Sequence, residues 1–227
     1  TSFVWSTESN QEEGRLGASL ASAGDINADG FGDVIIGDFA YDNGEVNEGR
    51  VTVFHGSGSG LSTTPAWTAE SNQMNAWFGN SVATAGDVNG DGFGDVIIGA
   101  YNYDNGQSDE GRAYVYLGSA SGLGASPAWI GESNQVEAYY GYSCATAGDV
   151  NSDGFSDVIV GSQFFDNGQE TEGRAFVYMG SSTGLSTSPA WTAESNQEGG
   201  WFGYSVSTAG DVNGDGVTNI SDFNILA

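Results

Sequence analysis

The sequence repeats itself every 62 residues, and this period constrains the fold more than any other feature. One repeat position holds Trp5, Trp67, Trp129 and Trp191, and a glycine, an aspartate and a glutamate recur in the same register. No insertion breaks the spacing along the 227 residues. A long, regular period is typical of propellers, solenoids and other arrays, in which each unit packs on its neighbours.

Each unit contains four short segments of strand-forming residues that are separated by turns. In the second unit these segments are residues 81–85, 95–99, 112–117 and 128–130, and Asp-Gly, Asn-Gly and Ser-Gly pairs stand between them. Such pairs suit tight turns with positive φ, and no segment has the sustained 3.6-residue apolar period of a helix. We therefore predict an all-β fold, a β-propeller-like array of four-stranded antiparallel blades.

The predicted array holds about three and a half repeats. An N-terminal outer strand within residues 1–15 completes a blade, and three full repeats follow at residues 16–77, 78–139 and 140–201. A partial fourth repeat occupies residues 202–227.

Both ends of the predicted array are incomplete sheets. The chain begins with an outer strand around residues 3–6 and ends just after a first strand near Val206. A known propeller needs at least four blades, so the chain is part of a longer protein, or several chains complete one ring, or blades stack openly between subunits. Unfinished sheet edges favour pairing with another chain, and head-to-tail pairing generates a ring or a filament. We therefore predict self-association.

The connection between the first two strands of each unit contains regularly spaced acidic residues. In the first unit, Asp25 to Asp33 read Asp-Ile-Asn-Ala-Asp-Gly-Phe-Gly-Asp. Oxygen side chains at loop positions 1, 3, 5 and 9, with the carbonyl of position 7, converge on one point when the chain wraps tightly, and glycine at position 6 permits the turn. Such oxygen ligands suit Ca²⁺. An Asx-turn explains one such loop without an ion, but three at a constant spacing favour calcium. The predicted ligands of the three Ca²⁺ sites are Asp25, Asn27, Asp29, Phe31, Asp33, Asp87, Asn89, Asp91, Phe93, Asp95, Asp149, Asn151, Asp153, Phe155 and Asp157.

The fourth loop departs from this pattern. Its position 9 is an asparagine, Asn219, and an acid stands at position 12, Asp222. A last ligand at position 12 is the EF-hand arrangement. The predicted ligands of this fourth Ca²⁺ site are Asp211, Asn213, Asp215, Val217, Asn219 and Asp222.

The charge balance limits the partners of the chain. Thirty Asp and Glu residues stand against four arginines, and the formal net charge is −26. This charge repels phosphate backbones and anionic lipids, so we expect no nucleic-acid partner. The apolar runs are too short to span a membrane, so we expect no membrane insertion. A single cysteine, Cys144, excludes an internal disulfide bond.

The units resemble FG-GAP repeats, the blades of the N-terminal propeller of integrin α-subunits. The Phe-Gly pair stands at Phe78-Gly79 and Phe202-Gly203, with variants at Leu16-Gly17 and Tyr140-Gly141, and the Gly-Ala-Pro position reads Gly37-Asp38-Phe39, Gly99-Ala100-Tyr101 and Gly161-Ser162-Gln163. The resemblance implies extracellular, calcium-stabilised propellers used in adhesion and ligand recognition. Residues 210–222 also resemble a dockerin-type calcium loop.

Three other sets of residues admit two interpretations each. The aligned tryptophans either pack between blades, which we favour, or stack on sugars. The arginines Arg50, Arg112 and Arg174 share one repeat position, and we favour structural ion pairs over an anion-binding rim. The acidic connectors that begin at Asp42, Asp104 and Asp166 are either hairpin turns, which we favour, or a second set of cation sites.

The sequence contains no catalytic constellation. His55 is the only histidine and has no carboxylate or nucleophile partner near it in the sequence, and Cys144 aligns with core aliphatic residues. We therefore expect no enzyme. The expected function is that of an extracellular or cell-surface, calcium-binding structural or adhesion protein that self-associates into a ring or a filament. The alternative is a propeller module of a larger surface protein that binds a carbohydrate or protein ligand.

Overall fold

The computed structural model of the chain describes residues 5–208, and this part is all-β, as the sequence predicts. Its strands form three four-stranded antiparallel sheets, each built in chain order from one repeat. The first sheet contains β1 (Ser19–Gly24), β2 (Asp33–Asp38), β3 (Arg50–Phe54) and β4 (Trp67–Glu70). The second contains β5 (Ser81–Gly86), β6 (Asp95–Ala100), β7 (Arg112–Tyr116) and β8 (Trp129–Glu132). The third contains β9 (Tyr140–Gly148), β10 (Asp157–Ser162), β11 (Arg174–Tyr178) and β12 (Trp191–Glu194).

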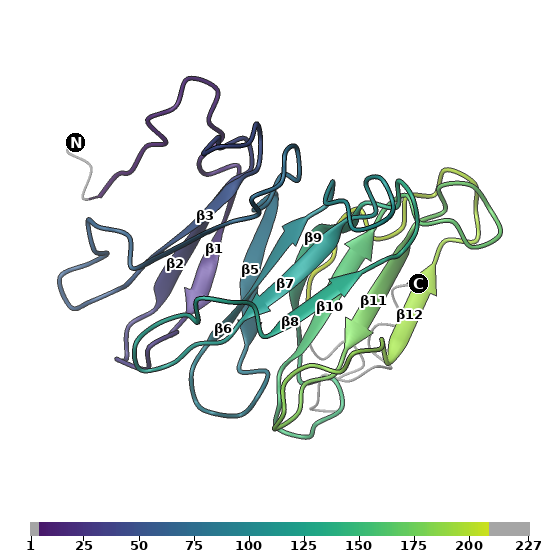
Figure 1. The fold of residues 1–227 in the computed structure, drawn as a ribbon. Helices are drawn as coiled ribbons and strands as arrows, with labels where there is room; N and C mark the ends of the chain where they lie inside the picture. The colour runs from purple at the N-terminus through teal and green to yellow at the C-terminus, as the bar shows by residue number, and fades with distance from the viewer. Residues whose placement is uncertain (1–4, 209–227) are drawn as a thin grey trace.

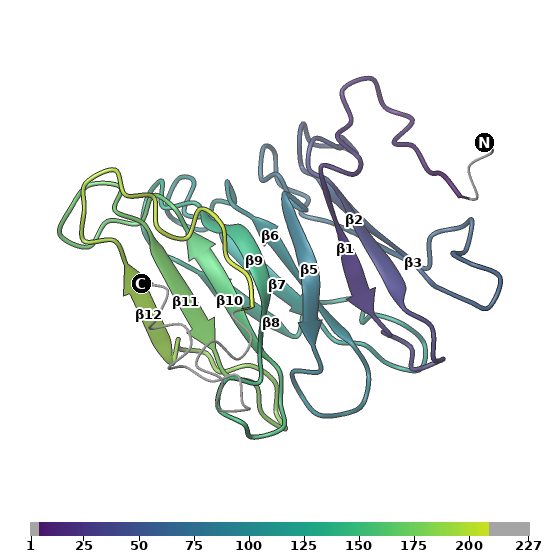
Figure 2. The same cartoon turned by 180° about the vertical axis from the view of Figure 1, so that it is seen from behind.

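The sheets stand side by side in chain order and do not close into a ring (Figures 1 and 2). The first strands lie along the contact between neighbouring sheets, with β1 against β5 and β5 against β9. None of the described residues belongs to a helix that is long and apolar enough to cross a lipid bilayer.

Within the described residues, two apolar cores lie between successive sheets, and a third is formed on and beyond the third sheet. Ile35 of the first sheet shares a core with Ile98 of the second, whereas the adjacent Ile97 shares the next core with Val160 of the third. Neighbouring residues of β6 therefore face opposite sheets, because side chains alternate along a strand. This explains why the second strand of each unit is a continuous apolar run: a strand with both faces covered needs apolar residues throughout.

Glycines mark the closest approach between neighbouring units. A Cβ at Gly99, near the end of β6, would overlap the carbonyl oxygen of Gly141 in the next unit. The N–H of Gly79 donates to the carbonyl of Gly99 (2.9 Å), and Gly141 has a φ of 81°. The preceding junction repeats the contact between Gly37 and Gly79. Glycine recurs at both positions of each pair for two reasons. The two backbones are in contact there, and the second glycine of the pair, Gly79 or Gly141, adopts positive φ.

The two ends of the array differ from the expectation. Val206 packs against the third sheet but lies outside a strand, because no described residue provides a second strand that would pair with it. Residues 1–4 fall outside the described part, and Trp5 and Ser6 do not form a strand. Trp5 nevertheless packs edge-on against Phe54, with ring centroids 4.9 Å apart.

Candidate calcium-binding loops

The three described candidate loops lie at one edge of the array. They join β1 to β2, β5 to β6, and β9 to β10, and they follow the arrow tips of β1 and β5 at the lower edge in Figure 2. The same edge therefore presents one loop per repeat. The fourth predicted site, with Asp211, Asn213, Asp215, Val217, Asn219 and Asp222, lies outside the described residues.

The side chains at loop positions 1 and 3 point to the same place. In the first loop, the N–H of Asp29 lies 3.1 Å from both Asp25 Oδ1 and Asn27 Oδ1. The N–H of Gly30 donates to Asp25 Oδ2 (2.8 Å), and Gly30 has a φ of 89°. The second and third loops repeat these bonds. The loop is therefore wrapped as predicted, with glycine at position 6 making the turn.

The side chain at position 5 lies beside the side-chain oxygen atoms of positions 1 and 3. Asp29 Oδ1 accepts the N–H of Phe31 (3.0 Å), and Asn27 Nδ2 donates to Asp29 Oδ2 (3.2 Å). Equivalent bonds recur in the second and third loops. Three of the predicted ligand side chains in each loop are thus brought together by the local backbone.

The carboxylate at position 9 is buried and ties the loop to a distant part of its sheet. Asp33 Oδ2 accepts the N–H of Ile26 (2.9 Å), and Asp33 Oδ1 accepts the N–H of Gly56 (2.8 Å), beyond the end of β3. Asp95 and Asp157 make the equivalent pairs of bonds, all of 2.8 Å. Two hydrogen bonds to backbone amides explain how a carboxylate is accommodated at a buried position.

Burial raises the pKa of Asp95 to about 6 and that of Asp157 to about 6. The carboxylates at positions 1 and 5 of the same loops raise these pKa values further, and the backbone amides oppose the shift. A cation held in the loop would favour the charged form of such a carboxylate.

The donors fit calcium in their chemistry. Each loop offers Asp and Asn oxygens and a backbone carbonyl, which are hard ligands, and three of the side chains already converge. Between residues 5 and 208, however, no three Asp, Glu, His or Cys side chains are gathered as a metal-binding group. At position 9 both carboxylate oxygens accept hydrogen bonds from backbone amides.

His55 lies beside the first loop, which the sequence did not suggest. Its Nδ1 is 3.4 Å from Asn27 Nδ2, and the side chain is half-buried. The two residues are 28 positions apart, and only the pairing of the strands brings them together.

Comparison with known proteins identifies the repeat. Residues 78–116 and 140–178 match the model of the FG-GAP repeat. Two of the units are FG-GAP repeats. The match includes the Phe-Gly pair at Phe78 and Gly79; Phe78 is buried and packs on Tyr114, with ring centroids 5.3 Å apart.

The relatives of the chain include integrin α-subunits. It is 32% identical to integrin alpha-V of Gallus gallus over 220 residues, which cover 92% of the chain and 20% of that protein. It is 35% identical to integrin alpha-7 of Rattus norvegicus over 145 residues (63% and 12%), and 32% identical to the phosphatidylinositol-glycan-specific phospholipase D of Homo sapiens over 208 residues (85% and 24%). The chain thus spans less than a quarter of the length of these relatives.

The aligned tryptophans pack between units. Trp129 Nε1 donates to the carbonyl of Ser186 (2.9 Å), and its ring lies edge-on to Tyr178 in the next sheet at 4.8 Å. Trp67 makes the same two contacts with Gly124 and Tyr116. These contacts agree with the packing interpretation, because the indole ring and its N–H are both used at the junction.

A second set of aromatic residues forms a row across the three sheets, which the sequence analysis missed. Neighbouring rings contact one another with centroids 5.0–5.7 Å apart, in the order Phe39, Trp77, Tyr101, Tyr139, Phe164 and Trp201. Trp77, Tyr139 and Trp201 have φ values of 55°, 56° and 51°. Positive φ is uncommon for bulky residues, so the backbone is strained at Trp77, Tyr139 and Trp201, whose rings belong to the row.

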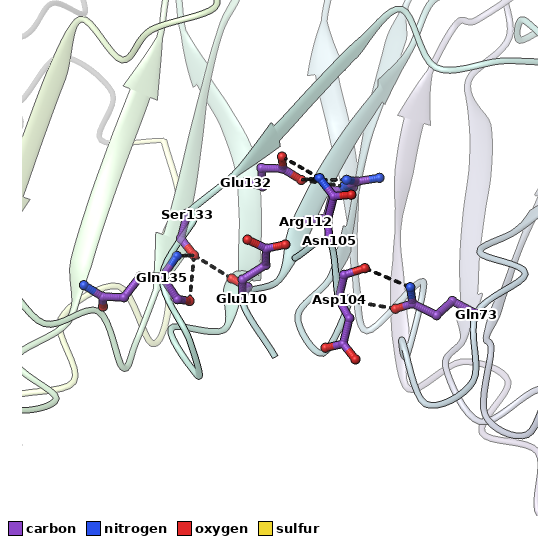
Figure 3. A network of polar contacts seen from close by, with 8 residues as sticks. All are labelled: Gln73, Asp104, Asn105, Glu110, Arg112, Glu132, Ser133 and Gln135. Atoms are coloured by element: carbon purple, nitrogen blue, oxygen red, sulfur yellow. Dashed lines mark hydrogen bonds and ion pairs between the residues drawn. The ribbon is translucent and has the colours of Figure 1, made fainter. Parts of the chain in front are cut away.

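Two of the three arginines at the shared repeat position form ion pairs, which is the interpretation that the sequence favours. Arg112 binds Glu132 at 2.6 Å (Figure 3), and Arg174 binds Glu194 at 3.1 Å. Arg50 instead stacks over the ring of Tyr41, with the guanidinium carbon 3.6 Å from the ring centroid.

The acidic connectors close as turns. The carboxylate of Asp104 accepts the N–H of Asp109 (2.7 Å), and Gly106 has a φ of 102°. The backbone of Asp104 is bound at both its N–H and its carbonyl by the side chain of Gln73 (Figure 3). The equivalent connectors at Asp42 and Asp166 make the same carboxylate bond.

Each acidic connector ends in a buried glutamate that the sequence analysis did not single out. Glu48, Glu110 and Glu172 are at most 1% exposed, and neither oxygen of any of the three carboxylates has a hydrogen-bond partner. In Figure 3 the bond from Ser133 goes to the backbone carbonyl of Glu110 and not to its carboxylate. Burial raises the pKa of Glu110, the nearby backbone N–H groups at Asn105 and Gln107 oppose the shift, and the charge of Glu132 adds to it.

Replacing Glu110 by glutamine is expected to stabilise the protein at neutral pH and to have less effect in acid. The pKa of Glu110 in the folded protein is raised above the ordinary 4.5. The protonated side chain therefore contributes its full share to the free energy of unfolding below pH 4.5, and this share is lost as the pH rises through the folded-state pKa. At neutral pH the free energy of unfolding of Glu110→Gln should exceed that of the parent, by about 1.4 kcal/mol for a pKa raised by one. Thermal unfolding measured from acid to neutral pH tests this expectation. The exposed Glu137, replaced in the same way, is the matched control; equal unfolding profiles of the two variants at every pH would contradict the prediction.

Proposed function

We propose that the chain is an extracellular, calcium-binding structural or adhesion module built as a propeller-like array. The observation that carries this proposal is the recurrence, at one edge of the array, of a nine-residue loop with oxygen side chains at positions 1, 3, 5 and 9. The similarity to integrin α-subunits supports the extracellular, adhesive part of the proposal. We propose no catalytic activity, no nucleic-acid partner and no membrane insertion.

Each loop would hold its ion with the three side chains that already converge, completed by two further ligands. In the second loop the convergent side chains are those of Asp87, Asn89 and Asp91. The side chain of Asp95 and the carbonyl of Phe93 would complete the set. A bound Ca²⁺ would supply charge neutralisation for three carboxylates of the loop. Extracellular calcium modules commonly bind in the range of about 0.1–1 mM, which suits the calcium concentration outside cells. The fourth loop is proposed as a further site of the EF-hand or dockerin type.

Calcium binding is tested directly by equilibrium dialysis of the full chain. We expect three to four Ca²⁺ ions per chain, and one fewer for the variant Asp91→Ala, which removes a proposed ligand at an exposed position. The variant Asp104→Ala is the control, because Asp104 belongs to an acidic connector that we interpret as a turn. A parent protein that binds no calcium would overturn the proposal, and so would an equal loss in the two variants.

We also propose that the array associates with further copies into a ring or a filament. Leu20 on β1 is 63% exposed, whereas the residues at the same repeat position, Val82 and Cys144, are 7% and 6% exposed because a preceding unit covers them. The first sheet thus presents a face that another unit covers elsewhere in the same chain. Light scattering at increasing concentration should give masses above that of one chain, and Leu20→Glu should reduce them. A monomer at all concentrations would contradict the proposal.

A second candidate function is the recognition of an extracellular glycan or protein ligand. The aromatic row favours it, because Trp201 and the adjoining Tyr204 are 50% and 53% exposed. Aromatic rings with one apolar face and one wet edge are suited to ligand contacts. Quenching of tryptophan fluorescence on addition of a glycan panel tests this function, with Trp201→Ala expected to abolish the response.

A further inference from the structure

The candidate calcium loops of neighbouring units are hydrogen-bonded to one another. The carbonyl of Asp25, at position 1 of the first loop, accepts the N–H of Gly94, at position 8 of the second loop (2.9 Å). The carbonyl of Asp87 accepts the N–H of Ser156 in the same way (2.8 Å). Position 1 of one loop is therefore attached to position 8 of the next.

A second hydrogen bond joins the backbone next to the first ligand to the following unit. The carbonyl of Ile26, directly after the first ligand, accepts the N–H of Ser119 beyond the end of β7 (3.1 Å), and Val88 and Ser181 make the equivalent bond (3.1 Å). The first ligand residue of each loop is thus followed by a residue that is also bonded to the next unit.

The contact between the loops leaves little space. A Cβ at Gly94 would lie 3.2 Å from both the nitrogen and the carbonyl oxygen of Asp25. At the next junction a side chain adds a bond, because the N–H of Asp87 donates to Ser156 Oγ (3.1 Å). A shift of one loop therefore requires a shift of its neighbour.

The place of this attachment matters for the ligands. Gly94 stands between Phe93, whose carbonyl is the proposed ligand at position 7, and Asp95, the proposed ligand at position 9. Ser156 stands likewise between Phe155 and Asp157. Ordering the first ligand of one loop thus orders the backbone between the last two ligands of the next.

We propose that these bonds couple the calcium loops, so that an ion bound in one loop raises the affinity of its neighbours, with Gly94 and Ser156 as positioning residues. The inference rests on the calcium binding proposed above. Coupling between sites is reciprocal, and in a linear array it acts between nearest neighbours, so the second loop influences both the first and the third. If the loops were independent, these bonds would only hold the sheets together and each loop would bind with its own affinity.

The array contains a matched pair of glycines that tests the coupling. Gly32 occupies position 8 of the first loop, where a Cβ would meet nothing within 4 Å, and neither Gly32 nor Gly94 has a positive φ. The variants Gly32→Ala and Gly94→Ala therefore make the same change at the same loop position, and only the second presses on a neighbouring loop. Calcium titrations of the full chain by isothermal calorimetry compare them.

The parent and Gly32→Ala are expected to bind calcium with a Hill coefficient above one. Gly94→Ala is expected to bind with a lower Hill coefficient, because it disturbs the contact between the first and second loops and leaves the bonds between the second and third loops in place. Removing a ligand of the second loop with Asp91→Asn should weaken the remaining sites by roughly fivefold or more, the usual lower range of coupling between sites. A merely structural contact would not change the affinity of loops that keep all their ligands.

Ser156→Ala keeps the test decisive if Gly94→Ala does not fold, because it removes one side-chain bond and adds no atoms. It should lower the cooperativity between the second and third loops. Independent, equal isotherms for the parent, Gly94→Ala and Ser156→Ala would overturn the coupling and leave calcium binding intact. A parent protein that binds no calcium would instead overturn the proposed function on which the inference rests.

Discussion

Chelation of calcium is expected to lower the midpoint of thermal unfolding by roughly 15–30 °C. A ligand that binds only the folded state stabilises it by about 2.7 kcal/mol at a concentration 100 times its Kd. Three such sites contribute about 8 kcal/mol, and each kcal/mol moves the midpoint of a domain of this size by roughly 2–4 °C. Circular dichroism melts with saturating calcium and with excess chelator measure the difference.

Two comparisons make the chelation experiment specific. Excess magnesium added to the chelated protein should restore little stability, because Mg²⁺ demands a tighter octahedral set of ligands than these loops offer. Asp91→Ala should show a smaller calcium-dependent shift than the parent, since it has one site fewer. An unfolding midpoint that does not respond to the chelator would contradict the expectation.

Gly99→Ala is expected to destabilise the protein by about 3 kcal/mol, the upper end of the usual cost of overpacking. The added methyl group would overlap the carbonyl oxygen of Gly141, which belongs to the backbone of the next unit and cannot rotate away. The two sheets must separate to accommodate it. The expected fall in the unfolding midpoint is roughly 6–12 °C.

Gly124→Ala is the matched control for this change. It is exposed, has no positive φ, and a Cβ there would have only ordinary contacts, the nearest at 3.5 Å. It should unfold close to the parent. If Gly99→Ala and Gly124→Ala lose the same small amount of stability, the close approach of the backbones at Gly99 does not limit the side chain at that position, and the prediction is wrong.

The repeat and its strands were predictable because both depend on local sequence. The turn pairs and the apolar runs predicted a first strand at residues 81–85, and β5 covers Ser81–Gly86. The last strand was predicted at residues 128–130, whereas β8 runs Trp129–Glu132. Its extension to Glu132 follows from the pairing of Glu132 with Arg112 across the sheet, which no local pattern announces.

The loops were predictable in composition and less so in geometry. The spacing indicated oxygen donors at positions 1, 3, 5 and 9, and the first three converge as expected. The burial of Asp33 depends on the amide of Gly56, and the contact of His55 with Asn27 depends on strand pairing. Such features arise from residues that are more than 20 positions apart and therefore leave no signature in a short motif.

The uniform junctions have a consequence for the length of such chains. Trp67 and Trp129 reach the next unit through the same indole bond and the same aromatic contact. Deleting or inserting one whole period would therefore join surfaces that share these two tryptophan contacts. The array behaves as a modular scaffold, and a designer could lengthen or shorten it in steps of 62 residues while keeping the indole bond and the aromatic contact at each join.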